Sequence, residues 1–531
     1  MTVEDSNGTA TKGWHFAIVP VAVIFVIGFL CLAFHKAQMI GGETWDEAGH
    51  RIGIVEQIEV ARRWIGGDGS AHFSQVTRDY EFYGIVAVLP AYLTEIFLKY
   101  WGKTDVAGAY RYALHLTAFC GYFLTLIFSY LILVRTTPKK IDAAIGIGLL
   151  AVFPLWLGFS FFDYKDVPTA AFMMMGIYAA IGFLQSNGDH RSACRFAQVL
   201  AFATILIAGL KIPALILVVP SWIAALCVLI KRRQFAILIG MGALSTIGIF
   251  AITPVAWTDP LNFLASNIKQ VSQNPWGQCT HIYGTCAGTS SAEWSVAQYL
   301  LAWFSAQVPI LVILGFFGGL IISLRKGSVM WTISASAILP LAIIIALNST
   351  LYNGLRHVLF EIPIIFVIST IFWSDIGRRY GSTIIRALGV ALIGLFIWDN
   401  TAMFPYNYVY FNLPARQVAD ETNTATDLWG FSLKEASGLR VATSLNGTII
   451  GIPAHLVRPF VSTKRQVATI ENLMKLPSSS EISLISYTAH GFKLPDWCKE
   501  AEYITRQLPM GGRPLRLSFA ARCITPEGSI W

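Results

Sequence analysis

Long apolar runs alternate with short polar segments through the first 400 residues. A helix needs roughly 20 apolar residues to cross a bilayer, and runs of about this length recur along this part of the chain. They cover residues 16–34, 113–134, 143–160, 169–185, 235–252, 297–324, 330–347, 358–373 and 384–400. The pattern predicts an α-helical polytopic membrane protein.

A further run, residues 197–230, is too long for one ordinary span. As a helix it would reach roughly 50 Å, against a hydrocarbon core of about 30 Å. It is interrupted at Gly209, Lys211 and Pro213, so we divide it there into two spans. The chain is then expected to have about 11 transmembrane helices.

Basic clusters between the runs test this division, because cytoplasmic loops are enriched in Lys and Arg. With the break at Lys211 all of these clusters lie on one side, which should be cytoplasmic together with the N-terminus. They comprise Arg135, Lys139 and Lys140; Arg191 and Arg195; Lys231, Arg232 and Arg233; Arg325 and Lys326; and Arg378 and Arg379. Lys211 is therefore expected at the outer tip of a hairpin. The first run follows a polar segment without a basic n-region, so we interpret it as a retained span.

The chain changes sides at each span, and counting the spans in this way places the unusual polar segments on the outer face. These are the loop 35–111, the turn 161–168, the loop 253–294, residues 348–357 and the tail after residue 400. Within the first loop, Glu56–Trp64 and Tyr83–Trp101 mix apolar and charged residues, which predicts interfacial helices. The alternative, a span over residues 83–100, would reverse every later loop against the basic clusters.

The tail marks a shift in composition, with Ser, Thr, Asn and charge replacing the apolar runs. We therefore expect a membrane domain over residues 1–400 and a small α+β extracytoplasmic domain over residues 401–531. Leu439–Thr443, Thr448–Ile452 and Ile482–Tyr487 are interpreted as strands. Residues 496–507 are interpreted as including a helix.

Composition agrees with a membrane protein: 55% of residues are hydrophobic, 13% are charged and the mean hydropathy is +0.57. These values exclude an ordinary soluble globule. The net charge of +8 would suit a nucleic-acid partner. Because the basic residues fall in short clusters between spans, however, they are interpreted as topology signals.

Four of the eight cysteines are expected on the outer face. Cys279 and Cys286 share one loop, and Cys498 and Cys523 share the tail, which suits two disulfides if that face is oxidising. A metal site is the competing interpretation, since His281 lies between the first two. Their spacing matches no standard zinc pattern.

An acidic pair, Asp46 and Glu47, follows the first run where the chain emerges from the membrane. A carboxylate there can act as a general base on a hydroxyl, although acidic residues outside a span are commonly solvated surface. Lys165, Lys211 and Arg356 with its neighbour His357 are expected on the same face. Cations near the headgroup plane suit a lipid substrate that carries phosphate. For Arg356 and His357 the alternative is interfacial snorkelling.

Several short motifs, taken together and in order, resemble the GT-C glycosyltransferases. The resemblance is to the bacterial branch similar to protein O-mannosyltransferases and lipid A aminoarabinose transferases. The motifs are Asp46–Glu47, Tyr164–Pro168, Trp257–Pro260, Tyr352–His357, Phe404–Asn412 and Asp427–Gly430.

The resemblance implies transfer of a sugar, with inversion, from a polyprenyl-phosphate carrier to an acceptor hydroxyl at the outer face. Asp46 would be the base, with Glu47 as support. Lys165, Lys211 and Arg356 would stabilise the departing phosphate, and His357 would either donate to it or only pack. Substrate contacts are expected from Tyr164, Asp166, Tyr352 and Trp276, although Trp276 would equally serve as an interfacial anchor. The absence of an Asp-x-Asp motif and of a glycine-rich nucleotide loop argues against a required metal, a cofactor or a nucleotide-sugar donor.

Departures from the family leave the substrates open. The Lys-Pro-Pro-Leu element of aminoarabinose transferases is missing, and residues 79–84 read Asp-Tyr-Glu-Phe-Tyr-Gly where it might fall. A hexose, pentose or uronic acid donor would suit the same cations, and the acceptor would be a glycan, a lipid or a protein in the envelope of a bacterial inner membrane. A lipid-linked-sugar transporter or flippase would instead place ionisable residues mid-span. A membrane scaffold is the third class considered.

Overall fold

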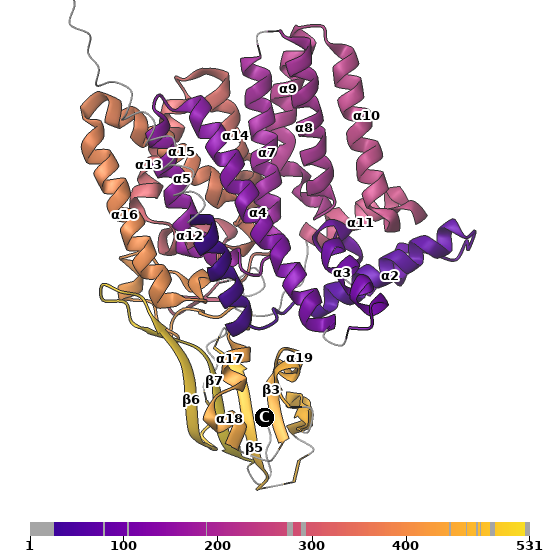
Figure 1. The fold of residues 1–531 in the computed structure, drawn as a ribbon, viewed down its shortest axis with the longest axis vertical. Coiled ribbons are helices and arrows are strands. Elements are labelled where there is room, and N and C mark those ends of the chain that lie inside the picture. The colour runs from indigo at the N-terminus through magenta and orange to yellow at the C-terminus, as the bar shows by residue number, and fades with distance from the viewer. Residues whose placement is uncertain are drawn as a thin grey trace, which may run out of the picture.

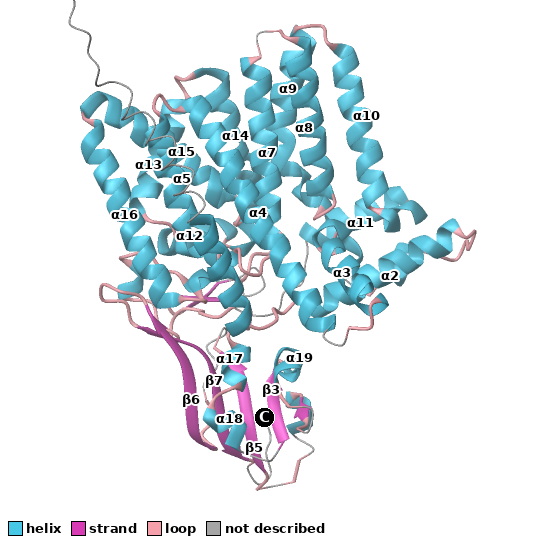
Figure 2. Ribbon diagram, viewed as in Figure 1, coloured by secondary structure: helices cyan, strands magenta, loops and turns pink. Residues whose placement is uncertain are grey.

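A helical body and a smaller sheet domain make up the protein, which we describe from a computed structural model (Figure 1). The structure describes residues 26–77, 80–103, 106–186, 188–272, 280–287, 294–444, 448–462, 465–473, 476–477, 479–488 and 494–525. The long helices run side by side in the upper part of the view, and the strands lie below one end of them (Figure 2). This arrangement confirms a multi-span helical protein with a small C-terminal domain that contains a sheet.

Seven helices among the described residues are long and apolar enough to cross a membrane. They are α4 (Val106–Thr136), α7 (Asp166–Gln185), α8 (His190–Ala208), η4 with α9 (Ile212–Lys231), α10 (Phe235–Ile252), α14 (Gly327–Ala346) and α16 (Ser382–Met403). Two shorter apolar helices cover Val26–Ile40 and, as α13, Ile310–Ser323. The remaining helices of the bundle are α5 (Lys140–Val152), α6 (Pro154–Phe159), α12 (Val296–Gln307) and α15 (Glu361–Tyr380). The count of about 11 spans stays a prediction.

The chain turns between α8 and η4 at Lys211, as the division of the long apolar run predicted. The segment between α2 and α3 pairs with this turn, because the Gly84 amide donates to the Leu210 carbonyl at 3.0 Å and residues Tyr83 and Lys211 form a β-bridge. A Cβ on Gly84 would lie 2.0 Å from the Gly209 carbonyl oxygen, so only glycine fits there. The loop is thereby fixed against the end of the bundle.

Two helices of the first outer loop, α2 (Glu47–Ile65) and α3 (Leu89–Tyr100), lie at the end of the bundle that faces the sheet domain (Figure 1). α3 has 12 residues, about 18 Å of helix, which is too short to be the alternative span. α2 begins at Glu47, earlier than the predicted Glu56. Gly49 and Gly53 weaken the helical signal, yet a Cβ on either would collide with Tyr80, whose ring packs against them.

Five strands form the sheet of the tail, in the order β4-β3-β5-β7-β6. β3 is parallel to β4 and β5, whereas β7 is antiparallel to β5 and β6. The strands are β3 (Thr448–Ile452), β4 (Val467–Ala468), β5 (Glu481–Tyr487), β6 (Cys498–Gln507) and β7 (Pro514–Ile524). The predicted strands Thr448–Ile452 and Ile482–Tyr487 are confirmed. Short helices accompany them: α17 (Leu433–Ser437), α18 (Arg440–Ser444), α19 (Ala454–Val457) and α20 (Ile470–Leu473).

Two predictions for the tail were wrong. Leu439–Thr443 is not a strand: most of it lies in the short helix α18, which buries the consecutive residues Val441 and Ala442 instead of alternate ones. The expected helix within residues 496–507 is the edge strand β6. Charged side chains such as Lys499 and Glu500 lie on this exposed edge, where charge prevents unwanted strand pairing.

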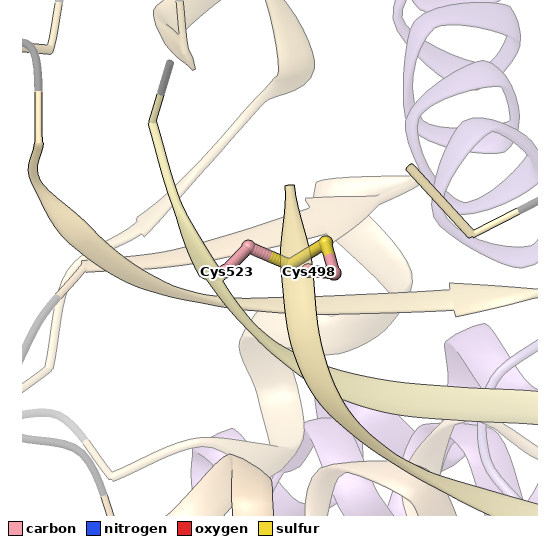
Figure 3. Close-up of a disulfide and its surroundings, with 2 residues drawn as sticks. All are labelled: Cys498 and Cys523. Carbon is pink, nitrogen blue, oxygen red and sulfur yellow. A yellow bond between two sulfur atoms is a disulfide. The ribbon is translucent and has the colours of Figure 1, made fainter. Parts of the chain in front are cut away.

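A disulfide joins Cys498 at the start of β6 to Cys523 on β7, where the two residues are register partners (Figure 3). This confirms one of the two predicted pairs. The other pair lies outside the described side chains, since Cys279 falls in an undescribed segment and only the backbone of Cys286, on β2 (Thr285–Ala287), is described.

One core runs from the bundle into the tail. The ring of Phe162, in the turn before α7, lies 5.7 Å from the ring of Trp429 and 4.9 Å from that of Phe431. The boundary between residues 400 and 401 stays a prediction, and α16 continues to Met403.

Remaining segments are the helix α11 (Pro260–Ser272), the strand β1 (Thr280–Ile282), and the 3-10 turns η1 (Phe73–Gln75), η2 (Tyr80–Phe82), η3 (Ile85–Ala87), η5 (Pro254–Thr258), η6 (Arg356–Val358), η7 (Asn407–Val409), η8 (Ala415–Gln417) and η9 (Arg458–Phe460).

Candidate active site

Four segments that are distant in sequence converge on Asp46, the residue just before α2. Oδ2 of Asp46 accepts from Nζ of Lys165 and from Nη2 of Arg356, each at 2.6 Å. Lys165 immediately precedes α7, and Arg356 begins the 3-10 turn before α15. Lys211 joins from the tip of the α8–η4 hairpin through an ion pair with Asp166. The structure therefore brings the predicted carboxylate and the predicted cations together.

Charges of opposite sign alternate through this cluster. Nε of Arg356 lies 3.5 Å from Oδ2 of Asp166, so Asp166 connects Lys211 to Arg356 while Asp46 connects Arg356 to Lys165. A third carboxylate, Asp163, accepts from the backbone amides of Lys165 and Asp166 and thereby shapes the turn that presents both side chains. We call the five linked side chains Asp46, Lys165, Asp166, Lys211 and Arg356 the charge cluster.

The charge cluster is mostly shielded from solvent: the side chain of Lys165 is 2% exposed, that of Arg356 5% and that of Asp46 21%. Burial alone would raise the pKa of Asp46, but Lys165 and Arg356 outweigh it and hold that pKa well below its usual value. Burial lowers the pKa of Lys165, although Asp46 opposes the shift. The Asp46 carboxylate is therefore deprotonated, and it is paired with two cations.

Aromatic side chains form the walls around the cations. The guanidinium carbon of Arg356 lies 3.9 Å from the centre of a Trp429 ring, and Nζ of Lys165 lies 4.6 Å from that of Tyr83. Cation–π contacts of this kind hold a buried charge without neutralising it. Nε2 of His50 is 3.3 Å from Nζ of Lys165, and burial followed by the Lys165 charge lowers the pKa of His50 well below its usual value.

Glu47 faces away from the cations. Its Oε1 accepts from the amide and hydroxyl of Thr44, both at 2.7 Å, and lies 2.8 Å from Nε2 of His115. His115 in turn contacts Gln38, whose amide donates to the Phe161 carbonyl. This network joins the start of α2 to the first helix, to α4 and to the turn before α7. Glu47 is therefore placed to hold the segment that carries Asp46.

The motif Asp427–Gly430 forms a buried turn that reaches the site from the tail. The carboxylate of Asp427 accepts from the amides of Trp429, Gly430 and Ser432, and from the hydroxyl of Tyr408 at 2.6 Å. One side of the turn sets Trp429 against Arg356. The other carries Phe431, whose carbonyl accepts from the Gly42 amide at 2.9 Å. The tail thus supports both sides of the charge cluster.

His357 and Tyr352 lie beside the cations, with ring centres 4.4 Å apart. Burial and the neighbouring Arg356 lower the pKa of His357 to about 3, so its ring is neutral at physiological pH. Its Nε2 is buried without a hydrogen-bond partner among the described residues. Burial also raises the pKa of Tyr352, so its hydroxyl stays protonated. Both rings offer neutral polar atoms next to the charges.

Some predicted and some unexpected residues complete the picture. Tyr164 is buried beside Lys165, 5.8 Å from its ring centre to Nζ, whereas Trp276 lies outside the described residues. The sequence interpretation missed His50 and the contacts of Tyr83 and Trp429. A signal existed for His50, which is four residues after Asp46 and therefore on the same face of a helix. Within the described part of the chain, no group of three or more His, Cys, Asp or Glu side chains could hold a metal ion.

Comparison with known proteins gives no match among protein-family models or curated proteins. Among solved structures, ArnT from Cupriavidus metallidurans bound to undecaprenyl phosphate is 12% identical, with a TM-score of 0.47, over 96% of this chain and 98% of that one. The same protein in the apo state gives a TM-score of 0.48. The Archaeoglobus fulgidus oligosaccharyltransferase tethered with an acceptor peptide is 12% identical over 83% of this chain and 63% of that one, with a TM-score of 0.41. Because these TM-scores are below 0.5, the chemistry of this chain must be inferred from its own side chains.

Proposed function

We propose that this chain is an inverting glycosyltransferase that moves a sugar from a polyprenyl-phosphate donor to an acceptor hydroxyl at the outer membrane face. The observation that supports this most is the pairing of Asp46 with Lys165 and Arg356 where the first outer loop meets the spans. A carboxylate beside two cations supplies a base for the hydroxyl and positive charge for the departing phosphate.

In the proposed reaction the acceptor oxygen attacks the anomeric carbon while the bond from that carbon to the phosphate oxygen breaks. The hydroxyl proton passes to Asp46, and the bonding electrons stay on the phosphate. Attack from the face opposite the leaving group inverts the anomeric configuration. The products are a glycosylated acceptor and a polyprenyl phosphate.

Charge counting supports this assignment. The charge cluster has three cations, Lys165, Lys211 and Arg356, and two carboxylates, Asp46 and Asp166, so it carries a surplus of one positive charge. A donor phosphodiester contributes one negative charge and brings the sum to zero. After transfer the phosphate has gained a second negative charge and Asp46 a proton, so the sum is still zero. No step builds net charge in a partly dehydrated site, where charge is costly.

In this scheme, Lys165 and Arg356 must release Asp46 and pair with the phosphate when the donor binds. In the structure Asp46 forms hydrogen-bonded ion pairs with both Lys165 and Arg356, which are the cations assigned to the phosphate. A carboxylate whose pKa is lowered this far is a weak base. When phosphate oxygens take over the two cations, Asp46 loses the charges that lower its pKa and gains basicity. The base is thereby activated only when the donor is present.

The remaining predicted residues have supporting roles in this proposal. Asp166 positions Lys211 and Arg356, while Glu47 positions the segment that carries Asp46. The neutral ring of His357 can donate a hydrogen bond to phosphate, and the hydroxyls of Tyr164 and Tyr352 are assigned to sugar contacts. No cofactor takes part. The donor sugar is a hexose, pentose or uronic acid, and the acceptor is an envelope glycan, a glycolipid or a protein at a bacterial inner membrane.

Substitution of Asp46 by Asn tests the base and the exchange of partners together. We expect D46N to lower sugar transfer by roughly 10²- to 10⁴-fold, the usual contribution of a general base. Polyprenyl phosphate should bind D46N several-fold more tightly than the wild type, since the competing carboxylate charge is gone. Both are measured on purified protein in nanodiscs, with radiolabelled donor and by titration with polyprenyl phosphate.

Substitution of Arg356 by Ala should have the opposite effect on binding, because it removes a cation from the phosphate. The matched control is R62A on α2, where Arg62 forms only an exposed pair with Glu59; it should change neither property. Normal transfer by D46N would remove Asp46 from the base role. Weaker lipid-phosphate binding by D46N would rule out the partner exchange, and transport of intact donor without transfer would favour a flippase.

A further inference from the structure

A groove opens between α5, α13, α15 and α16. It faces the lipid, since Leu388 lines it and is 48% exposed on the spanning helix α16. Most of its wall is apolar, and one end is polar, where Asp142, Ser374 and Arg386 line it. This polar end lies near the start of α5 and α16 and the end of α15, at the membrane boundary marked by basic clusters. Arg356 lies at the other end of α15, so the groove is distinct from the charge cluster.

The polar end holds a guanidinium with spare donors. Nε of Arg386 donates to Oδ1 of Asp142 at 2.8 Å, and the Ser374 hydroxyl donates to Oδ2 of Asp142 at 2.6 Å. Nη2 of Arg386 is buried and has no hydrogen-bond partner among the described residues. A guanidinium has five N–H donors, and a donor left unpaired in an apolar site is costly. Arg386 is therefore oriented by Asp142, while its Nη2 lacks an acceptor among the described residues.

Positive charge is in excess at this end. Lys326, Arg378 and Arg379 all pair with the single carboxylate of Asp375, the neighbour of Ser374. Together with Arg386 and Asp142 this makes four cations against two carboxylates, a surplus of two positive charges. A ligand with net negative charge complements this surplus, whereas the amine of a zwitterionic headgroup would add to it.

We propose that this groove binds one anionic phospholipid from the leaflet at the basic ends of the helices. Its phosphate would accept from Arg386, and an acyl chain would lie along Leu388 and Leu392 towards the middle of the membrane. Guanidinium forms strong, charge-assisted hydrogen bonds with phosphate oxygens. The inference is independent of the function proposed for the charge cluster.

Native mass spectrometry of the full chain, released from nanodiscs of equal phosphatidylglycerol and phosphatidylethanolamine, tests the proposal. We expect the wild type to retain one phosphatidylglycerol in about fivefold preference, equivalent to the roughly 1 kcal/mol that one basic side chain contributes at an anionic lipid surface. The variant R386Q removes one of the four cations and keeps an amide that can donate to Asp142, so it should fold and lose the preference.

Two further variants separate the groove from general lipid binding. L388W places a large ring on the lipid-facing wall without disturbing the core, and it should lower retention of the bound lipid severalfold. R191Q, a charge removed from the exposed start of α8, is the matched control and should behave as the wild type. Equal retention of the two lipids by the wild type, an unchanged preference in R386Q, or full retention by L388W would each overturn the proposal.

Discussion

At the scale of single residues, the two neighbouring carboxylates Asp46 and Glu47 have opposite surroundings. Asp46 pairs with Lys165 and Arg356, whereas Glu47 turns towards Thr44 and His115. Successive residues of a helix project about 100° apart, so the first turn of α2 separates them. The sequence suggested Asp46 as the base and Glu47 as its support. Those roles stay predictions, and the contacts are the ones they require.

Other residues of the site differ in how far the sequence could indicate them. Lys165, Lys211 and Arg356 were found because each follows or precedes an apolar run on the predicted outer face. Gln38 and His115 lie inside or beside apolar runs, where a single polar residue gives no sign of its partner. Their contacts depend on how the first helix packs against α4, which hydropathy alone does not determine.

Another carboxylate near the site, that of Glu43, allows a test by pH. Burial and the nearby Glu47 raise its pKa to about 7, although Arg111 opposes this shift. The folded state therefore binds this proton more tightly than the unfolded chain, where the pKa is near 4.5. Between about pH 4.5 and 7 the folded protein carries the extra proton, so the free energy of unfolding decreases as pH rises and levels off above pH 7.

We expect E43Q to remove this part of the pH dependence, which amounts to about 3 kcal/mol. Melting temperatures of the detergent-solubilised wild type and variant between pH 4.5 and 8 measure it. The two proteins should differ in slope below pH 7 and run parallel above it. An equally steep decline in E43Q would show that another group carries the proton.

At the scale of elements, the segment before α2 is held by the tail at a glycine. A Cβ added to Gly41 would lie 2.0 Å from the ring of Phe431, and the Gly42 amide donates to the carbonyl of that residue. We expect G41A to cost about 1 to 3 kcal/mol of stability, as overpacking does. It should also lower sugar transfer by displacing Asp46.

The matched control for G41A is G28A, because a Cβ on Gly28, in the first helix, meets nothing within 4 Å. Melting temperature and transfer rate of both variants make the comparison. If G41A and G28A behaved alike, the contact between Phe431 and Gly41 would have no part in holding the site.

The elements that sequence predicted best are those set by hydropathy. The turn between α8 and η4 at Lys211 follows from the length of the apolar run and from the positions of the basic clusters. The elements between and after the long apolar helices were harder to predict: Gly49 and Gly53 weaken the helical signal at the start of α2, and β6 was expected to include a helix. The structure of these segments depends on contacts with other parts of the chain. Tyr80 packs against α2, and β7 pairs with β6.

At the scale of the whole molecule, the tail and the bundle share a core through Phe162, Trp429 and Phe431. Composition showed where the chain becomes polar near residue 400. It gave no sign that the polar part packs against the turn before α7, because that contact rests on single aromatic residues. The tail therefore contributes residues to the candidate site in addition to forming the sheet domain.

Loss of the disulfide should loosen this part of the molecule. Cys498 and Cys523 are 25 residues apart, and closing a loop of that length stabilises a fold by about 3 kcal/mol in the chain-entropy account. We expect the C498S/C523S variant to melt at a lower temperature and to be cut faster by protease in the tail. The control is C31S/C120S, which changes two free cysteines in the bundle. Equal protease resistance of the two variants would contradict the prediction.

The position of the turn that carries Trp429 and Phe431, late in the sequence, affects when the site can form during synthesis. Asp46 and its neighbours are among the first residues that the ribosome makes, whereas this turn is made almost 400 residues later. At typical rates of 5 to 20 residues per second, that interval is roughly 20 to 80 s. Until the tail has folded against the bundle, Arg356 lacks the ring of Trp429 and the Gly42 amide lacks the Phe431 carbonyl. If the chain has the proposed activity, a nascent chain should therefore be inactive until this turn has been made and has folded against the bundle.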